Sequence, residues 1–556
     1  MEALNKTIFY HEETKHHPHR LARSPGYLDW ANQPNPFRFW EGCERIDLPL
    51  LKDPSHTYTA LYDYRMVNTE RFTLESISKF LELALGLSAW KAIPGSRWSV
   101  RMNPSSGNLH PTEGYLIIPH LGNLEGVFHY NPFLHALEKR ASLPPELSDR
   151  IKDFFGSEGF IFVFTSIPWR EAWKYGERAY RYCLLDTGHA IGSLRFSANL
   201  KGWKVKYLSG LSDDDLNYLL GFHRVKWIKG EEEFPECAFF VFPKDVHDVP
   251  RTLPQDIIKE FEKLRFFGRP NVLSKERVIW EIIYEAIKGT EKPKTEEFKF
   301  IYGNPPFLNI VPSYMSAEEV IRRRRSGMAY DGKTYIDAEL FVHILDKTLP
   351  RDEYSPFDVE ITPSFINLFI FVHRVRNLKR GLYCFVRNEK LLNLLKRNTT
   401  PEFIWERVYE DFPLYLLYEG DFREIAGYIS CQQDIASDSA FSLGMISLFE
   451  PVVNRKPWFY KHIHWEAGLI GHVLYLEATA HDLNGTGIGC FFDDVMHELL
   501  GIKTREIQDL YHFTLGKAVE DPRIQTIEPY FHLKKKRTES KKPKRGNKTI
   551  RSADSL

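Results

Sequence analysis

The sequence predicts an α+β protein built from two tandem domains, each with a central sheet. Three observations support this fold class: the length, an internal repeat, and apolar runs of strand length that lie between helical patterns. The chain has 556 residues. Domains usually run about 100–200 residues, so we expect more than one.

The internal repeat joins two distant segments. The stretch "YRYCLLDTGHAIGSLRFSANLKGW" begins at Tyr180, and "YKHIHWEAGLIGHVLYLEATAHDL" begins 280 positions later at Tyr460. The same offset places "DDDLNYLLG" (213–221) on "DDVMHELLG" (493–501). This period is far too long for a solenoid, so it indicates a duplicated domain.

Each repeat block has the three-and-four apolar spacing of a long helix, and each helix contains an interior glycine, Gly188 or Gly468. Because an interior glycine costs a helix about 1 kcal/mol, close packing against a neighbour is the expected reason for it. We therefore predict that the two long helices cross at these glycines.

Strands are predicted at "GYLIIP", "GVFHY", "GFIFVFTSI" and "CAFFVFP" in the first half, and at "INLFIFVHRV", "GLYCFV", "LYLLYEG" and "FTLGKAV" in the second. The expected units are a loop-rich N-terminal extension (1–55), a first domain (56–250), a linker (251–276), a second domain (277–530) and a disordered basic tail (531–556).

Composition narrows the function classes. Lys+Arg and Asp+Glu are both 74, so a formal net charge of +0 indicates no general attraction to nucleic acid or membrane. The 6 cysteines show no CxxC pattern, which disfavours zinc ribbons and disulfide frameworks and fits the cytoplasm. The most apolar run, 365–372, is far shorter than the roughly 20 residues of a membrane helix, and we interpret it as a buried strand. The basic tail is expected to be solvated, with weak nucleic-acid or membrane contact as the alternative.

Four stretches carry candidate chemistry. The loop in "RMNPSSGNLHPTEGYLI" (101–117) offers hydroxyls, an amide and backbone N–H groups that suit the edge of a flat ring, or it is an ordinary turn before a strand. The run "EEVIRRRRSGMAYDG" (318–332) has arginine forks that suit phosphate, or it is a solvated helix face. The stretch "NGTGIGCFFDD" (484–494) follows a helix, so it is not a dinucleotide-fold fingerprint, and it exposes backbone to a ligand or caps that helix. In "FTLGKAVEDPRI" (513–524), Lys517 and Arg523 could meet an anion.

Other polar stretches are less informative. The histidines His16, His17 and His19 form a short cluster, but near-adjacent loop histidines seldom bind metal, and we predict no metal site. The segment 430–441 either faces a cavity or only caps a helix. Cys431 and Cys490 lie in candidate pocket segments without an evident partner histidine.

Together these four stretches resemble the FMN-dependent nitroreductase family. The matching elements are "RRS" (324–326), "PSSGN" (104–108), "GIGCF" (487–491) and "GKAVEDPR" (516–523). The longer pattern "KYGERAYRYCLLDTGHA" (174–190) is similar to the SagB-type branch, the thiazoline/oxazoline dehydrogenases, as is the opening "YHEETKHHP". The resemblance implies two tandem nitroreductase-like domains with mixed or antiparallel sheets that form a pseudo-dimer within one chain.

The resemblance also implies FMN between the halves. The residues it places at the cofactor are Pro104, Ser105, Ser106, Asn108, Arg324, Arg325, Ser326, Gly487, Ile488, Gly489, Lys517 and Arg523. The well-kept loop is in the first half and the well-kept arginine arm is in the second. The opposite combination, Arg65 with "TPSFIN" (362–367), departs from the pattern. We therefore expect one intact site and one weak or empty one.

In the dehydrogenase branch a Lys-Tyr pair is linked to catalysis, and Lys174 and Tyr175 match it. A lysine or tyrosine can remove the Cα proton while hydride passes to flavin, and Arg178 and Arg181 could depress the pKa of Lys174. The alternative is that Lys174 and Tyr175 are structural helix residues. The leading prediction is an FMN-dependent oxidoreductase, with dehydrogenation of peptide azolines as the finer hypothesis. The alternatives are NAD(P)H-driven reduction of nitro compounds or quinones, and a non-catalytic flavin-binding scaffold of a peptide-modifying complex. A small-molecule or peptide substrate is expected, without specific nucleic acid, membrane span or required oligomer.

Overall fold

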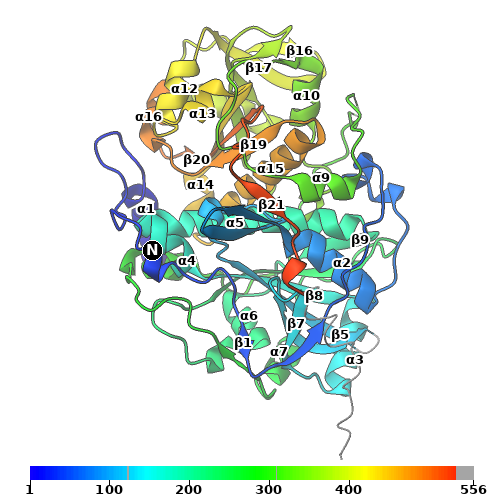
Figure 1. The fold of residues 1–556 in the computed structure, drawn as a ribbon. Helices are drawn as coiled ribbons and strands as arrows, with labels where there is room; N and C mark the ends of the chain where they lie inside the picture. The colour runs from blue at the N-terminus through cyan, green and yellow to red at the C-terminus, as the bar shows by residue number, and fades with distance from the viewer. Residues whose placement is uncertain (122–123, 309, 534–556) are drawn as a thin grey trace, which may run out of the picture.

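Each half of the chain forms its own seven-stranded antiparallel sheet (Figure 1). The computed structural model describes residues 1–121, 124–308 and 310–533. The first sheet contains β2 (Glu44–Asp47), β5 (Thr112–Leu121), β6 (Leu124–Asn131), β7 (Ala136–Ala141), β8 (Phe160–Ser166), β9 (Trp203–Tyr207) and β10 (Phe234–Pro243). The second contains β13 (Ile366–Val372), β15 (Gly381–Phe385), β16 (Glu406–Tyr409), β17 (Phe412–Glu419), β18 (Phe441–Leu448), β19 (Asn484–Ile488) and β20 (Ile507–Gly516).

The two sheets have the same topology. The first runs β2-β7-β6-β5-β8-β10-β9 and the second runs β16-β17-β15-β13-β18-β20-β19. Without the edge strands β2 and β16, strands numbered along each half follow the order 3-2-1-4-6-5 in both sheets. The edge strands differ, because β2 comes from the N-terminal extension and β16 from the hairpin with β17. The duplicated α+β architecture predicted from the repeat is therefore confirmed.

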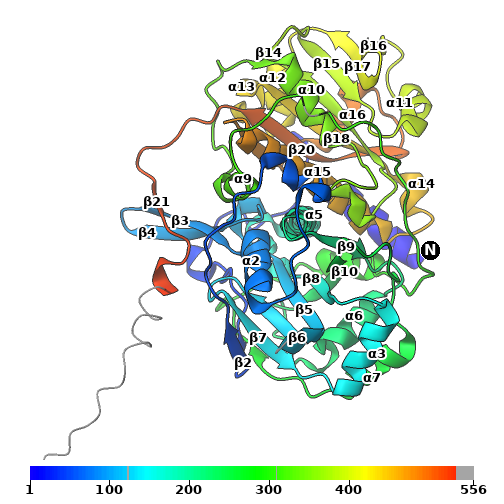
Figure 2. The same ribbon diagram turned by 90° about the vertical axis from the view of Figure 1, so that its right-hand side faces the viewer.

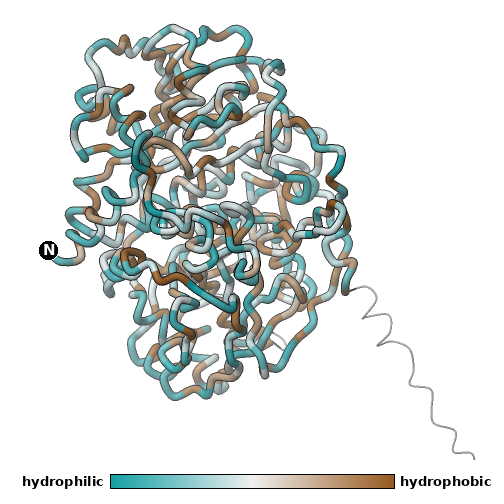
Figure 3. The backbone as a smooth tube through the Cα atoms, turned by 60° about the vertical axis from the view of Figure 1, so that its left-hand side comes forward, coloured by the Kyte–Doolittle hydropathy of each residue, from teal (hydrophilic) through white to brown (hydrophobic). Residues whose placement is uncertain are grey.

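The pleat of the central strands explains how each sheet is covered on both faces. In β8, Phe160, Phe162 and Phe164 enter the large core between the two halves, whereas Ile161 and Val163 enter the outer core of the first half. The strand β13 alternates in the same way between the shared core and an outer core of the second half. Strands buried on both faces are continuous apolar runs, which is why these segments were recognisable in the sequence. Figure 3 shows that hydrophobic stretches of the backbone recur through the molecule.

Helices cover the outer faces and fill the space between the sheets. The first half has α2 (Leu74–Leu85), α3 (Pro145–Phe155), α4 (Pro168–Tyr175), α5 (Ala179–Asn199), α6 (Asp213–Leu220) and α7 (Gln255–Phe261). The second has α9 (Ala317–Arg323), α10 (Ala338–Asp346), α11 (Leu392–Asn398), α12 (Arg423–Ile429), α13 (Asp434–Asp438), α14 (Glu450–Val453), α15 (Phe459–Ala480) and α16 (Asp493–Leu500). Helices α1 (Glu2–Glu13) and α8 (Glu281–Gly289) pack on each other beside these two units.

The long helices α5 and α15 cross at the predicted glycines, in the middle of the molecule (Figure 1). A Cβ added at Gly188 would lie 2.3 Å from the carbonyl oxygen of Trp465, and one at Gly468 would lie 2.2 Å from that of Leu185. Both helices are buried along their whole length. The glycines are therefore needed because the two backbones touch, as the repeat predicted.

Both chain ends bridge the halves. The C-terminal strand β21 (Gln525–Ile527) leaves the second half and pairs with β3 (Leu87–Ile93) of the first, beside β4 (Ser96–Arg101) (Figure 2). At the other end, helix α1 contacts both halves, because Tyr10 donates to the Glu177 carbonyl of the first at 2.9 Å and His11 Nε2 lies 3.2 Å from Gln508 Oε1 of the second. The extension expected to be loop-rich therefore begins with a helix that packs on the core.

Several local expectations need correction. Lys174 does not share a helix with Arg181, which was expected to act on it, because α4 ends at Tyr175 and Gly176 adopts φ 57 before α5 begins. The strand expected at 513–519 ends at Gly516, and the glycine stretch begins as strand β19 and not as a loop. The domain boundaries stay predictions, although Ile257 of α7, inside the expected linker, packs in the first outer core. Residues 534–556 of the predicted basic tail lie outside the described residues.

Within the described part of the chain, no helix has the length and apolar character needed to cross a membrane. The run 365–372 that drew attention in the sequence forms the buried central strand β13 with one flanking residue. That interpretation of the run is confirmed.

Candidate functional site

The serine loop of the first half is fastened to helix α5 by a carboxyl group. Ser105 Oγ lies 2.5 Å from Asp186 Oδ2, and the Ser106 backbone N–H and hydroxyl donate to Asp186 Oδ1 at 3.0 and 2.9 Å. Gly107 and Asn108 have positive φ, so the loop folds back as a tight 3-10 turn. The hydroxyls predicted to face a ring therefore hold the loop in place, and the buried Pro104 precedes them.

Asn108 is also engaged by neighbouring groups. Its Nδ2 donates to the Ser99 carbonyl at 2.8 Å, and its Oδ1 lies 2.8 Å from His110 Nε2. The loop thus presents a rigid backbone rather than free side-chain donors.

The predicted Lys-Tyr pair lies directly against this loop. A Cβ at Gly107 would be 2.8 Å from the Tyr175 hydroxyl and 3.4 Å from Lys174 Cδ. Lys174 Nζ sits 5.1 Å from the centre of the Tyr175 ring, which stacks on Tyr182 at 4.2 Å. Burial is the main cause that raises the pKa of Tyr175 well above its ordinary value, so its phenol keeps its proton at neutral pH.

The two arginines expected to act on Lys174 are used elsewhere. Arg178 and Arg181 both pair with the buried Asp493 of α16, at 2.9 and 2.8 Å. The turn at Gly176 is the reason, because it separates the helix that carries Lys174 from the helix that carries Arg181. These arginines join the two halves.

A buried carboxyl pair beside the loop was not foreseen as part of the site. Burial raises the pKa of Asp186 to about 7 against its hydrogen bonds from the serines. Burial, and then the charge of Asp186, raise the pKa of Glu171 well above its ordinary value. The sequence repeat could have identified Asp186, because this residue aligns with Glu466 at the offset of 280 positions. No comparable signal marked Glu171.

The arginine arm of the second half reaches the strand that leads into the serine loop. Arg324, which follows α9, donates from Nε to the Met102 carbonyl and from Nη2 to the Arg101 carbonyl, both at 3.0 Å. These two carbonyls lie just before the loop at 104–108. Residues more than 200 positions apart in the sequence are thereby brought together.

The arm carries buried positive charge without a counterion. Burial lowers the pKa of Arg324 to about 10, and burial with the Arg324 charge lowers that of Arg325 to about 10. Among the described residues, no carboxylate forms an ion pair with either guanidinium, and Arg325 Nε is buried without a hydrogen-bond partner. An anion such as a phosphate fits this donor set, because it would supply the missing charge and acceptor.

Ser326 and the glycine stretch adjoin the arm through Tyr475. The hydroxyls of Ser326 and Tyr475 lie 2.9 Å apart, and the Gly487 N–H donates to the Tyr475 hydroxyl at 3.0 Å. A Cβ at Gly489 would lie 2.0 Å from the ring of Tyr182, so this glycine allows close contact with the first half. Ile488 differs from its neighbours, since it packs in the outer core of the second half.

The two C-terminal cations are bonded outside this cluster. Lys517 is exposed and donates to the Asp482 carbonyl at 2.7 Å, while Arg523 pairs with Asp521 at 2.7 Å on the surface. The structure thus groups the serine loop, the Lys-Tyr pair, the arginine arm and the glycine stretch, and it does not bond Lys517 or Arg523 to them.

The opposite combination of loop and arm is occupied by internal contacts. Glu466 accepts from Thr362 Oγ1 at 2.8 Å and pairs with Arg387 at 2.6 Å. Tyr302 donates to the Thr362 carbonyl at 2.5 Å and is thereby wedged against this loop. Arg65 pairs with its neighbour Asp63 at 2.8 Å and is half exposed.

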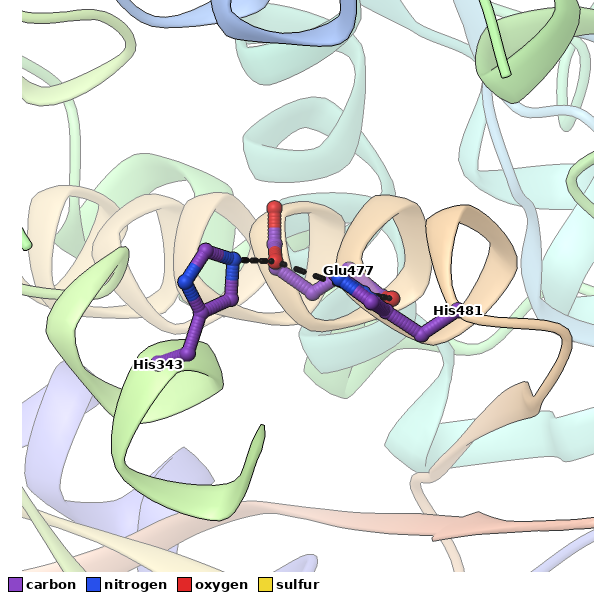
Figure 4. A group of neighbouring side chains, drawn as sticks. All are labelled: His343, Glu477 and His481. Carbon is purple, nitrogen blue, oxygen red and sulfur yellow. Dashed lines mark hydrogen bonds and ion pairs between the residues drawn. The ribbon is translucent and has the colours of Figure 1, made fainter. Parts of the chain in front are cut away.

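A second polar cluster, His343, Glu477 and His481, has the composition of a metal site (Figure 4). His343 Nε2 lies 3.1 Å from Glu477 Oε2, while the Val311 N–H lies 3.5 Å from His343 Nδ1 and His481 Nδ1 lies 2.9 Å from the Glu477 carbonyl. Tyr58 adds a hydrogen bond to Glu477 at 2.5 Å. The arrangement is a buried polar network that links α10 to α15, in which Glu477 Oε2 contacts the two histidines but has no hydrogen-bond partner among the described residues.

Comparisons with known proteins fit this architecture. A model of the nitroreductase family matches residues 62–230, which include the serine loop and the Lys-Tyr pair but not the arginine arm. A protein of Anabaena variabilis, solved as a candidate nitroreductase, is 23% identical over 92% of this chain and 99% of its own, with a TM-score of 0.68. That likeness shows the fold of both halves.

Two further solved structures match smaller parts. A chain of the Escherichia coli microcin synthetase complex is 22% identical over 36% of this chain and 71% of its own, with a TM-score of 0.26. An FMN-dependent nitroreductase of Clostridium difficile is 14% identical over 36% of this chain and 86% of its own, with a TM-score of 0.20. No curated protein matches the chain.

Proposed function

We propose that this protein is an FMN-dependent oxidoreductase with one cofactor site between its halves. The observation that carries the proposal is the contact of Arg324 with the Arg101 and Met102 carbonyls, which joins the anion-binding arm of one half to the serine loop of the other. The match of residues 62–230 to the nitroreductase family supports the choice of cofactor.

Different residues of the chain would bind the phosphate and the ring of FMN. Arg324, Arg325 and Ser326 would hold the phosphate, because they supply one buried guanidinium group, one half-buried guanidinium group and a hydroxyl at one place. The backbone of the loop at 104–108, fixed by Asp186, would orient the ring. The chemistry that FMN supplies when bound is hydride exchange at its N5 atom.

Lys174 and Tyr175 are the proposed proton-handling groups. They lie against Gly107 at the loop, and the phenol of Tyr175 stays protonated at neutral pH. A protonated phenol beside a lysine can donate a proton, while a neutral lysine can remove one from substrate carbon. In the finer form of the proposal the substrate is a peptide azoline that loses its Cα proton. The alternative is NAD(P)H-driven reduction of nitro compounds or quinones.

Flavin stoichiometry and redox behaviour of the purified protein test the proposal. We expect about one FMN per chain, bleached by a reduced nicotinamide or by an azoline peptide and recovered with an acceptor. A ratio near two would contradict the single site. A bound flavin that no donor reduces would instead support the non-catalytic scaffold.

Substitution of Lys174 tests its proposed role as a proton-handling group in azoline dehydrogenation. Lys174→Ala should abolish azoline dehydrogenation while flavin remains bound, because the lysine is proposed to handle the proton and not the phosphate. Lys152→Ala, which removes an exposed lysine from the last turn of α3, is the matched control. Normal dehydrogenation by Lys174→Ala would contradict the assigned role.

A further inference from the structure

Two cysteines from separate segments of the second half lie face to face. Cys431 follows α12 and Cys490 follows β19, and their sulfur atoms are 2.7 Å apart. The other four cysteines have no such sulfur neighbour among the described residues, and three of them are fully buried. Both members of the pair are half-buried, so small reagents can reach them.

We propose that Cys431 and Cys490 form a redox-active dithiol that exchanges with disulfides of small thiols. The proposal is independent of the flavin assignment, because it concerns only the chain's own sulfur atoms. It rests on their proximity, on the backbone that presents them, and on the charged groups around Cys490.

The backbone is shaped to bring the sulfurs together. Cys431 and Gln432 both have positive φ, 54 and 60, which is an unusual conformation for two successive residues other than glycine. Gln433 Nε2 then donates to the Cys490 carbonyl at 3.2 Å and to the Ser430 carbonyl at 2.7 Å. Strained backbone of this kind persists where the surroundings fix it, and here it places one thiol on the other.

His16 of the N-terminal extension faces Cys490. The sequence alone had indicated no partner histidine for this cysteine. His16 Nδ1 accepts from the Ala22 N–H at 3.0 Å, so Nε2 carries the ring proton and donates to the Cys490 sulfur. Arg178 adds positive charge, since its Nε donates to the carbonyl of Gly489 at 3.2 Å. These donors stabilise a thiolate.

The two thiols therefore differ in acidity. The hydrogen bond between the two thiols, and then the hydrogen bond from His16 and the positive charge of Arg178, lower the pKa of Cys490 to about 5. The pKa of Cys431 is raised well above its ordinary value by the same contact and by burial. One nucleophilic thiolate beside one protonated thiol is the pairing that disulfide exchange requires.

The exchange balances without any other reactant. The Cys490 thiolate attacks one sulfur of an external disulfide and releases the first small thiolate. The Cys431 thiol gives its proton to that thiolate, and its sulfur then attacks the mixed disulfide on Cys490 and releases the second. The pair is oxidised by two electrons to an internal disulfide, and the external disulfide is reduced to one thiol and one thiolate.

Oxidation would tie the turn after α12 to the segment after β19. That segment includes Gly489, which packs on the ring of Tyr182, and Tyr182 stacks on Tyr175. The internal disulfide would thus restrain the part of the second half that contacts the Lys-Tyr pair.

The test uses the full-length protein in buffers of reduced and oxidised glutathione, followed by acid quench, alkylation and peptide mass mapping. We expect an internal disulfide that joins the peptides of Cys431 and Cys490, with a mass lower by two hydrogens. Cys431→Ser should instead accumulate glutathione on Cys490. Cys43→Ser, which removes the remaining half-buried thiol, should behave as the unaltered protein. A fully reduced pair in the most oxidising buffer, or glutathione on both cysteines without an internal bond, would overturn the proposal.

The pH dependence of alkylation gives a second readout that does not depend on the fold of a cysteine variant. Iodoacetamide should label Cys490 with a midpoint near pH 5, whereas burial raises the pKa of Cys43 to about 11. The charged or titratable groups that face the pair are His16, Arg178, Asp493, Tyr182 and Tyr175. His16→Gln should move the Cys490 midpoint upward by about one pH unit. Equal labelling profiles for Cys490 and Cys43 would contradict the proposed thiolate.

Discussion

At equivalent positions of the repeat, Asp186 and Glu466 each fasten the corresponding loop of their own half to its long helix, α5 or α15, yet their surroundings differ. Glu466 is ion-paired with Arg387 at 2.6 Å. Asp186 has no ion-pair partner among the described residues, and burial raises its pKa to about 7. In the second half, an ion pair therefore neutralises the carboxylate at this position. In the first half, the carboxyl group can gain or lose a proton near neutral pH.

The arginine arms differ in the opposite sense. Arg324 is buried with carbonyl partners alone, whereas Arg65 is half exposed and paired with Asp63. Each half has thus kept one part of a site and used the other part for packing. The helix crossing is therefore symmetric, whereas the loop and the arm of the proposed site differ between the halves.

The largest expected effect tests the symmetric part. Gly188→Ala and Gly468→Ala should each lower the free energy of unfolding by more than about 4 kcal/mol, because the added methyl meets a carbonyl oxygen at 2.3 or 2.2 Å. Chemical denaturation would measure this loss. Gly427→Ala, where the methyl has only ordinary contacts in α12, should be neutral or stabilising by up to about 1 kcal/mol. A mild effect of either crossing variant would break the symmetry argument.

The next effect separates the two carboxyl groups. Glu466→Gln should lower the free energy of unfolding by about 3 kcal/mol at pH 7, since it leaves the buried Arg387 without its counterion. Asp186→Asn should cost less than about 1 kcal/mol, because no buried cation loses a partner. Denaturation of both variants at one pH makes the comparison, and equal losses would show that the two positions have not diverged.

A third effect contrasts the two arms. Arg324→Ala should weaken FMN binding about 30-fold, as expected for the loss of one charged hydrogen-bond donor set of about 2 kcal/mol. Arg65→Ala should leave binding unchanged, because Arg65 already pairs with Asp63. Fluorescence titration of the apoprotein with FMN would measure both. Equal weakening of FMN binding by the two variants would contradict the placement of the phosphate at Arg324.

Much of the architecture could be predicted from the sequence because it depends on local patterns. The shared offset marked the duplication, the interior glycines marked the helix crossing, and apolar runs marked the central strands buried on both faces. The complementarity of loop and arm was also visible, since each half keeps a different motif.

The rest depends on contacts between distant segments, which no local pattern encodes. Gly176 breaks the expected helix because a Cβ there would lie 2.3 Å from the Arg23 carbonyl of the N-terminal extension. Arg178 turns to Asp493, more than 300 positions away, and His16 reaches Cys490 across the same interface. The serine hydroxyls likewise serve Asp186, whose role appears only once α5 is placed beside the loop.

The smallest effect concerns the proton on Asp186. Its folded pKa of about 7 lies above the unfolded value near 4, so the folded state binds the additional proton between these limits. Stability from this group is therefore full at acid pH and is lost as pH rises from about 4 to 7. Between about pH 5.5 and 7, the free energy of unfolding should fall by about 1–2 kcal/mol more in the unaltered protein than in Asp186→Asn. The control is Asp214→Asn, an exposed position in the first turn of α6, which should keep the slope of the unaltered protein. Parallel pH profiles for the unaltered protein and Asp186→Asn would mean that this carboxyl is ionised throughout, and that the two halves differ in pairing alone.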